Sequence, residues 1–335
     1  MSASIGGLLI RPPLMNSSSP WASSHEDLSN LYECPFTGAV TTRTATLSGF
    51  QEDAAIHQVA FHSESATSIN SYGYSPHPLS SYIRWVGDIL GRNADSRKPF
   101  IISITTNASS ELREMLGIIQ ALRRSLSDGT SSTRVGVEIN TSCPNITGQP
   151  PMSYEPTRLR PLLDVITEFV AQDEFFVVGI KLPPYVHSNQ FVDVIDVLSS
   201  ISPSRAESAT RSSRHPIAFL TCTNTLGSCL LFNSQTLDPK ANSSDFALPT
   251  IWGGMGGESI HPLSLGNVRA FTQLLQSHSE EAMRDIVVIG VGGVTSPAAV
   301  ARMQEAGASV VACATILGRK GVGVFEELVK GVKGS

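Results

Sequence analysis

Charged residues are scarce in this sequence: Asp, Glu, Lys and Arg make up 16% of it, against roughly 25% in an average soluble domain. The net charge is −5, so there is no surplus of basic residues for binding nucleic acid. No apolar run approaches the ~20 residues that a membrane-spanning helix requires. The apolar patch at residues 5–10 has no cationic segment before it, which excludes a typical secretion signal. We therefore expect a cytoplasmic protein whose partners include neither nucleic acid nor membranes.

Cysteine is sparse as well, and its spacing excludes two further classes of protein. The chain contains five cysteines, an odd number, and none of them forms a Cys-x-x-Cys pair. A disulfide framework like that of small secreted domains therefore does not fit, and neither does a zinc site. We expect no metal site, and we regard Cys34, Cys222, Cys229 and Cys313 as structural residues. Cys143 stands in a different context.

The hydrophobic residues, 41% of a chain of 335 residues, are sufficient for one large core. Short apolar runs alternate with amphipathic segments, which is the pattern of βα units around a parallel sheet. The pattern predicts strands at residues 7–16, 38–46, 100–105, 135–139, 175–182, 217–222, 286–291 and 310–316, and helices at residues 25–34, 79–90, 111–126, 156–171, 191–201, 262–275, 297–306 and 324–332. About eight units fit, which favours an α/β fold of the closed (β/α)₈ TIM-barrel type. We expect a single domain over residues 1–335 with an N-terminal strand extension.

Two stretches interrupt this alternation. Residues 203–216 are rich in Ser, Arg and Ala, which predicts a flexible surface insertion; the alternative is that its three arginines bind phosphate. Residues 230–251 are too long for an ordinary connection between a strand and a helix. We expect this second insertion to cover the mouth of the barrel.

A polar loop, residues 140–150, follows the strand predicted at residues 135–139. Its prolines and its glycine prevent the strand from continuing. The loop places small polar side chains and the thiol of Cys143 at the carboxyl end of a barrel strand, where barrel enzymes carry out their chemistry. A lone cysteine is more often a small buried hydrophobic residue, but this setting favours a catalytic role for Cys143.

Lys181 lies near the end of the apolar strand predicted at residues 175–182. A buried lysine is costly without an anionic partner, so an inward-pointing Lys181 would require one. The alternative is an ordinary lysine that points outward into solvent.

Four asparagines, Asn70, Asn140, Asn145 and Asn224, lie at predicted strand ends or in loops near the mouth. A single loop asparagine usually serves a turn. Four together offer neutral hydrogen-bond donors and acceptors that suit the edges of a flat heterocycle.

Glycine-rich turns at residues 253–257 and 290–293, together with Ala314 and Thr315, lie near the last predicted strand ends. Barrels often bind phosphate there because backbone N–H groups converge. None of these segments matches the GxGxxG motif of dinucleotide-binding folds. Each one taken separately is equally compatible with an ordinary turn.

Two motifs carry a resemblance to a known family. Residues 140–145 read Asn-Thr-Ser-Cys-Pro-Asn and residues 181–185 read Lys-Leu-Pro-Pro-Tyr. In this order, followed by the glycine-rich turns, they resemble the dihydroorotate dehydrogenases of the soluble class 1, most closely class 1A. The resemblance implies an FMN-dependent homodimer of pyrimidine biosynthesis that oxidises (S)-dihydroorotate to orotate and passes the electrons to fumarate. It implies that Cys143 removes the proton from substrate carbon C5 while hydride leaves C6, and that Lys181 neutralises charge on the reduced flavin.

The resemblance also assigns the other site residues by position. Those expected to bind substrate are Asn70, Ser71, Tyr72, Gly73, Tyr74, Asn140, Asn145, Asn224 and Thr225. Those expected to bind FMN are Ser17, Ser18, Arg43, Thr44, Asn140, Lys181, Thr223, Gly257, Gly292, Gly293, Ala314 and Thr315. Arg43 joins Cys143 and Lys181 in the catalytic set, because its position in the family touches both flavin and substrate.

Several positions depart from the family pattern. Arg43 stands where the family has a lysine, and this exchange is not conservative at a crowded site, although the planar fork of arginine can still hold a carboxylate. Tyr72 and Tyr74 stand where members often carry Met and Leu, Ala314 replaces a glycine, and Thr225 replaces a serine but keeps the hydroxyl. These departures leave open a sibling flavoenzyme that acts on another cyclic amide or enone. A barrel that only binds a ligand, and a class 1B enzyme with an iron–sulfur partner subunit, are further alternatives.

Overall fold

The structure, a computed structural model, describes residues 1–129, 133–146, 148, 150–203, 214–239 and 245–333. Eight parallel strands form one sheet in the order β3-β14-β13-β10-β9-β8-β7-β4. They are β3 (Leu14–Asn16), β4 (Val40–Thr41), β7 (Phe100–Ile104), β8 (Val135–Asn140), β9 (Val177–Leu182), β10 (Phe219–Cys222), β13 (Val287–Val291) and β14 (Val310–Cys313). A parallel bridge between Met15 and Ala39 joins the two edges of the sheet. The sheet thereby closes into a barrel, and the predicted (β/α)₈ fold is confirmed.

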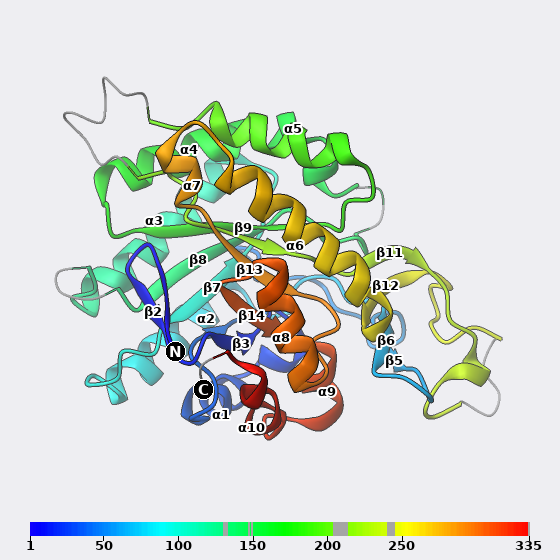
Figure 1. Cartoon of the computed structure of the whole chain (residues 1–335). Helices are drawn as coiled ribbons and strands as arrows, with labels where there is room; N and C mark the ends of the chain where they lie inside the picture. Colours follow the sequence, from blue (N-terminus) through cyan, green and yellow to red (C-terminus); the bar gives the residue numbers. More distant parts are fainter. Residues whose placement is uncertain (130–132, 147, 149, 204–213, 240–244, 334–335) are drawn as a thin grey trace.

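Helices surround the barrel and alternate with its strands (Figure 1). They are α1 (His25–Glu33), α2 (Leu79–Arg92), α3 (Ser109–Ser125), α4 (Arg160–Gln172), α5 (Ser188–Ser199), α6 (His261–Gln276), α7 (Glu281–Arg284), α8 (Pro297–Ala306), α9 (Thr315–Lys320) and α10 (Val324–Leu328). Short 3₁₀ turns occur at Pro20–Ala22, Met152–Tyr154, Pro156–Leu159, Asn233–Gln235, Glu258–Ile260 and Val329–Gly331. The long helices all overlap segments that the hydrophobic spacing predicts.

Ser24 caps the start of α1. Its hydroxyl accepts a hydrogen bond from the backbone N–H of Asp27 at 3.0 Å, and the Asp27 carboxylate accepts one from the N–H of Ser24 at 3.0 Å. This reciprocal pair satisfies two otherwise unpaired N–H groups, an arrangement that stabilises a helix by about 1 kcal/mol.

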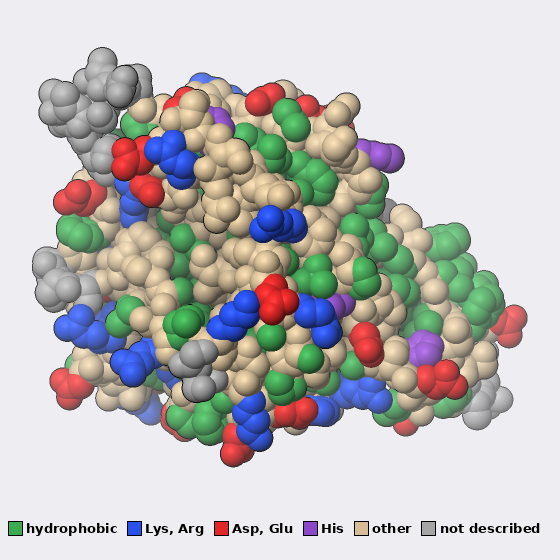
Figure 2. All heavy atoms as spheres, in the orientation of Figure 1, with side chains coloured by type: hydrophobic (Ala, Val, Ile, Leu, Met, Phe, Trp, Pro, Cys, Tyr) green, Lys and Arg blue, Asp and Glu red, His purple; other side chains and the backbone are tan. Residues whose placement is uncertain are grey.

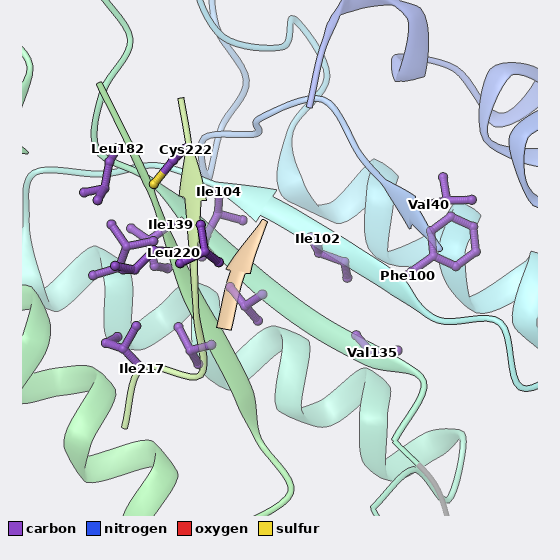
Figure 3. Packing of buried hydrophobic residues seen from close by; sticks show 14 of the residues in the cluster. Val40, Phe100, Ile102, Ile104, Val135, Ile139, Leu182, Ile217, Leu220 and Cys222 are labelled. Atoms are coloured by element: carbon purple, nitrogen blue, oxygen red, sulfur yellow. The ribbon is translucent and has the colours of Figure 1, made fainter. Parts of the chain in front are cut away.

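Alternate residues of the barrel strands face two different environments. On β7 and β8, side chains such as Ile102, Ile104 and Ile139 face outward and pack in the large core between sheet and helices (Figure 3). The intervening residues, including Ser103 and Glu138, face into the barrel, because successive side chains of a strand point to opposite faces. The barrel interior thus receives polar as well as apolar side chains.

A hairpin of β1 (Ala3–Ile5) and β2 (Leu8–Ile10) closes the end of the barrel where the strands begin. Leu8 forms a parallel bridge with Thr133, just before β8. The side chains of Ile5, Leu8 and Ile10 are fully buried in one cluster with Phe219, the first residue of β10. The predicted N-terminal strand extension therefore exists, and it fills the bottom of the barrel with apolar side chains.

A second, antiparallel sheet lies beside the opposite end of the barrel (Figure 1). Its strands, in the order β11-β12-β6-β5, are β11 (Leu226–Cys229), β12 (Gly253–Gly257), β6 (Thr67–Asn70) and β5 (Val59–Phe61). Residues 253–257, expected as a turn, are therefore a strand. Their glycines allow a close approach, because a Cβ atom on Gly257 would lie 2.1 Å from the carbonyl oxygen of Ala66.

The insertion expected over the mouth, residues 230–251, connects β11 with β12. Its described part, residues 230–239 and 245–251, contributes Leu231 and Leu248 to a small apolar cluster under the second sheet. Phe232, within the insertion, and Trp252, directly after it in the sequence, are exposed. Figure 2 shows hydrophobic side chains gathered on this side of the molecule. These described residues lie beside the mouth, and it is the flanking strands that reach it.

The predicted insertion at residues 203–216 falls largely outside the described residues, which omit 204–213. The described residues at its end, 214–216, form hydrogen bonds with neighbouring segments. One guanidinium nitrogen of Arg214 donates to the carbonyl oxygen of Gly6 at 3.0 Å. The buried ring of His215 lies 3.1 Å from the carbonyl oxygens of both Leu198 and Ile217.

The β-prone run at residues 38–46 forms a much shorter strand than predicted, Val40–Thr41. The backbone N–H of Arg43 donates to the carbonyl oxygen of Ala22, outside the sheet, at 3.0 Å. The regular ladder is thus interrupted after Thr41, where Arg43 and Thr44 line the cavity, and pairing with β7 resumes at Ala45, which forms a parallel bridge with Ile104.

Acidic and basic side chains are interspersed on the face shown in Figure 2. Within the described residues, none of the helices combines the length and the apolar character needed to cross a bilayer.

Candidate active site

A cavity opens at the end of the barrel where the parallel strands finish. Its volume is about 980 Å³ including the open space at its mouth. Of the site residues expected from the sequence, all but one line it: Ser17, Ser18, Arg43, Thr44, Asn70, Tyr72, Gly73, Tyr74, Asn140, Cys143, Asn145, Lys181, Thr223, Asn224, Thr225, Gly257, Gly292, Gly293, Ala314 and Thr315. The structure thus brings together residues that are up to about three hundred positions apart in the sequence.

Ser71 is the exception. Its hydroxyl donates to the carbonyl oxygen of Ile56 at 2.6 Å and accepts from the N–H of Gln58 at 3.0 Å. Ser71 therefore fastens two loops together and does not line the cavity. The cavity wall also contains residues that the sequence did not single out, among them Trp21 and Ile316. Neither belongs to a polar motif, so only the fold could have identified them.

Cys143 lies in the loop directly after β8, with its thiol at the cavity wall. Burial raises the pKa of this thiol. The backbone N–H of Asn145 and the positive charges of Lys181 and Arg43 act in the opposite direction, but burial is the larger effect. The group is therefore mostly a neutral thiol at neutral pH and becomes a base only on deprotonation.

The four asparagines form two hydrogen-bonded pairs at the cavity wall. The side-chain amide of Asn145 donates to the carbonyl oxygen and to the side-chain oxygen of Asn70, both at 3.1 Å. The amide of Asn224 donates to the side-chain oxygen of Asn140 at 3.2 Å, and the amide of Asn140 donates to the hydroxyl of Thr44 at 3.0 Å. Each side chain is thus held in one orientation by neighbours from other strands, which pre-organises the site for a polar ligand.

Lys181 points into the barrel, so the outward-pointing alternative is wrong. Lys181 is buried, with 4% of its surface exposed to solvent. The ammonium group donates to the hydroxyl of Ser17 at 3.2 Å and to the carbonyl oxygen of Ser18 at 3.4 Å. Burial lowers the pKa of Lys181, whereas the negative charges of Glu138 and Cys143 act to raise it.

Glu138 supplies the negative charge that acts most strongly to raise the pKa of Lys181, and the sequence analysis missed it. It lies on β8 with 1% exposure. Its two carboxylate oxygens accept hydrogen bonds from Ser103 at 3.1 Å and Thr221 at 2.8 Å. Ser103 in turn pairs with the hydroxyl of Thr44 at 3.0 Å. A chain of hydroxyl groups therefore connects the buried carboxylate with the floor of the cavity.

Replacing Glu138 with glutamine is expected to lower the pKa of Lys181 further, because the main charge that raises it is removed. Lys181 would then lose its positive charge at a lower pH than in the wild type. Carbon-13 NMR titration of lysine-labelled protein measures this directly, since the chain has only six lysines. The exposed Glu155→Gln is the matched control. An unchanged titration of Lys181 in Glu138→Gln would contradict the assigned pairing.

Glycines at the ends of β12 and β13 shape the far side of the cavity. Gly292 and Gly293 have positive φ angles of 122° and 67°, a conformation that only glycine adopts readily. A Cβ atom on Gly292 would lie 2.0 Å from the hydroxyl of Ser264. The strand predicted at residues 310–316 ends at Cys313, so that Thr315 begins α9. This corner therefore exposes backbone in a form that suits a phosphate group.

The guanidinium of Arg43 is already engaged within the protein. One nitrogen lies 2.5 Å from a carboxylate oxygen of Glu52 and also donates to the carbonyl oxygen of Tyr74 at 3.1 Å. The group stacks over the ring of Tyr72 at 5.3 Å from the ring centre. The arginine thus lines the cavity as predicted, but one of its guanidinium nitrogens is already paired with the carboxylate of Glu52.

The fold and the cavity define a TIM-barrel protein with a polar ligand site at the carboxyl ends of its strands. A sequence model described as dihydroorotate dehydrogenase matches residues 1–335. The chain therefore belongs to the dihydroorotate dehydrogenase family, whose members are flavin-dependent oxidoreductases acting on CH–CH groups. The family expected from the two motifs is confirmed.

Two relatives are similar over nearly the whole chain. A protein of Streptococcus equi subsp. equi (strain 4047), provisionally named dihydroorotate dehydrogenase A (fumarate), is 28% identical over 320 residues, which cover 95% of this chain and 87% of the relative. The dihydroorotate dehydrogenase (fumarate) of Lachancea kluyveri is 26% identical over 325 residues, covering 96% and 88%. At this level of identity single side chains of the site can differ while the fold is shared.

Proposed function

We propose that this protein uses FMN to oxidise (S)-dihydroorotate to orotate, a step of pyrimidine biosynthesis, and that fumarate reoxidises the flavin. The observation that carries the proposal is the meeting of Cys143 and Lys181 in one cavity with two hydrogen-bonded pairs of asparagines. A thiol that can act as a base, a buried cation and neutral amide groups are the components that this reaction needs. The family and the names of its relatives support the same reaction.

The residues of the cavity fit FMN in two respects. Ser17 and Ser18 engage two of the three N–H donors of the Lys181 ammonium, which leaves one for a flavin oxygen or nitrogen. At the other side, Gly292 and Gly293 line the cavity. A Cβ atom on either would collide with Ser264 or His261, so the turn requires glycine, and its bare backbone can approach a phosphate group. When bound, FMN supplies an acceptor for the hydride that leaves the substrate.

The chain itself supplies the proton chemistry and the positioning. Asn70, Asn145 and Asn224 hold the edges of the ring, and Thr225 adds a hydroxyl. Cys143 as thiolate takes the proton from C5, so that the C5–H electron pair forms the C5=C6 double bond as hydride departs from C6. The substrate thus loses one proton and one hydride, and the thiol must release its proton before the next turnover.

The test is a visible spectrum of the purified, FMN-loaded protein. Anaerobic addition of dihydroorotate is expected to bleach the flavin, and subsequent fumarate is expected to restore its colour. A flavin that dihydroorotate leaves oxidised would refute the proposed substrate, and one that fumarate leaves reduced would refute the proposed acceptor.

The rate of flavin reduction is expected to rise with pH through and above the ordinary thiol pKa of about 8.5. The base is the thiolate of Cys143, and burial raises the pKa of that thiol, so the active form accumulates only at alkaline pH. Tyr74 remains protonated over this range because burial raises its pKa to about 12. Anaerobic stopped-flow measurements at saturating dihydroorotate provide the profile. A rate that is flat or falls with rising pH would argue against Cys143 as the base.

A second candidate is a sibling flavoenzyme acting on a neutral cyclic amide. The pairing of Arg43 with Glu52 favours it, because this cation already has an anionic partner. Bleaching of the flavin by dihydrouracil but not by dihydroorotate would support this reading.

The assembly, the location and the domain organisation are proposed from the resemblance to class 1A. We propose a homodimer in the cytoplasm, in which residues 1–335 form a single FMN-binding domain. Light scattering of the purified protein measures the assembly, and limited proteolysis tests the single domain.

A further inference from the structure

The guanidinium of Arg43 already has an anionic partner within the protein, unlike a cation that is available to a substrate anion. The side chain of Arg43 is 6% exposed and that of Glu52 is 22% exposed, and their charged atoms are 2.5 Å apart. Ion pairs on a fully exposed surface contribute little, whereas a shielded pair with a short contact is considerably stronger. Within the described residues, Glu52 is the carboxylate that forms an ion pair with Arg43.

Glu52 is held in place by the loop that carries it. Phe50, two residues earlier, donates its N–H to the carbonyl oxygen of Ser75 at 2.8 Å. The N–H of Ser71 donates to the carbonyl oxygen of Gln58 at 2.9 Å. The loop around Glu52 is thus fastened at both ends to residues 71–75, the loop expected to bind substrate.

The remaining contacts of Arg43 limit where its guanidinium can go. The ring of Tyr72 lies under it at 5.3 Å, and the carbonyl oxygen of Tyr74 accepts from the same nitrogen that contacts Glu52. A planar fork held by a carboxylate, a carbonyl and an aromatic face cannot rotate freely toward a ligand. Glu52 and the carbonyl oxygen of Tyr74 both contact the same guanidinium nitrogen, while the other terminal nitrogen donates to the hydroxyl of Ser23 at 3.4 Å. A carboxylate that binds Arg43 therefore comes close to the charge of Glu52, and two carboxylates close together repel each other.

We propose that Glu52 is a specificity-determining residue that competes with a ligand's carboxylate for Arg43. It lowers the affinity of the cavity for anionic rings relative to neutral rings of the same shape. This inference rests on the proposed function in one respect, namely that a planar heterocycle binds beside Arg43 in the flavin-loaded protein.

The experiment compares orotate with uracil, which has the same ring without the carboxylate. Both are titrated into the FMN-loaded protein, and binding is followed by the flavin absorption spectrum. Glu52→Gln removes the competing charge but keeps the size of the side chain. Asp53→Asn is the matched control, because Asp53 is the adjacent carboxylate on the same loop and contacts the backbone N–H of Ala55.

In Glu52→Gln the dissociation constant of orotate is expected to fall by about tenfold, which corresponds to ~1.4 kcal/mol, while that of uracil changes by less than about twofold. Asp53→Asn is expected to leave both constants unchanged. Unchanged orotate affinity in Glu52→Gln would overturn the proposal. An equal loss for both ligands would also overturn it, because Glu52 would then serve only to hold the loop.

The test of Glu52 and the test of the proposed oxidation can fail independently of each other. If dihydroorotate fails to bleach the wild-type flavin, the proposed oxidation is wrong, yet a selective gain of orotate affinity in Glu52→Gln still supports the role of Glu52. If dihydroorotate does bleach the flavin but the ratio of the two affinities is unchanged, the oxidation stands and the role of Glu52 is refuted.

Discussion

The variant Cys143→Ala is expected to bind FMN normally and to lose flavin reduction by dihydroorotate by roughly 10²–10⁴-fold, the usual contribution of a general base. The thiol lies at the cavity wall in the loop after β8, and alanine removes the base without adding bulk. Anaerobic stopped-flow spectroscopy measures the rate, and the absorption spectrum of the same sample reports the bound flavin.

The control for this variant is Cys229→Ala. Cys229 is also a partly exposed cysteine near the mouth, on β11, but it does not line the cavity. The Cys229→Ala variant is expected to show flavin reduction by dihydroorotate at the wild-type rate. Normal reduction in Cys143→Ala would exclude the thiol as the base, and a loss of flavin in that variant would indicate a structural role.

The variant Lys181→Met is expected to slow flavin reduction by at least about a hundredfold and to destabilise the fold by ~3 kcal/mol. The first effect follows from the loss of a fixed cation next to developing negative charge. The second follows because Glu138 stays buried without its cationic partner, and an unpaired buried charge is costly. Stopped-flow spectroscopy measures the first effect, and urea unfolding of the protein measures the second.

A double variant separates charge from packing. If the cost in Lys181→Met is the unpaired carboxylate, then Lys181→Met combined with Glu138→Gln should recover most of the lost stability, because no buried charge is left alone. The double variant should remain as slow in flavin reduction as Lys181→Met. Equal instability of the single and double variants would show that Glu138 and Lys181 are not coupled.

Much of the barrel could be predicted from local pattern. The strands and helices that the structure contains differ from the predicted ranges mostly at their ends, since hydrophobic spacing identifies an element better than its boundaries. The run at residues 38–46 is confirmed only in part. β-branched residues favour a strand locally, and Val40, Thr41 and Ala45 do pair with β7, but the ladder is interrupted at Arg43 and Thr44, which line the cavity; local propensity does not predict that interruption.

The sequence motifs identified most of the residues that line the cavity. The reason is that the glycines, the asparagines and the cysteine occur at strand ends, which a parallel barrel brings together at one rim. The two glutamates were missed for opposite reasons. Glu52 lies in an irregular loop where an acidic residue is unremarkable, and only the folded chain brings it to Arg43. Glu138 did carry a signal: a single carboxylate in the middle of a buried strand requires a partner, and the requirement of Lys181 for an anion could have led to it.

The small second sheet was also missed, because its strands combine glycine-rich and irregular sequences that local propensity assigns to turns. In β12 the glycines are explained by the nearness of neighbouring backbone, as at Gly257. Such close approach between segments almost two hundred residues apart is a property of the assembled fold.

The hairpin of β1 and β2 fills one end of the barrel with apolar side chains, so the cavity is open at the opposite end, where the parallel strands finish. Dihydroorotate and fumarate would bind in this same cavity one after the other, so orotate must leave before fumarate binds. Dihydroorotate and fumarate are both small carboxylates, so the same amide groups can bind each of them in turn.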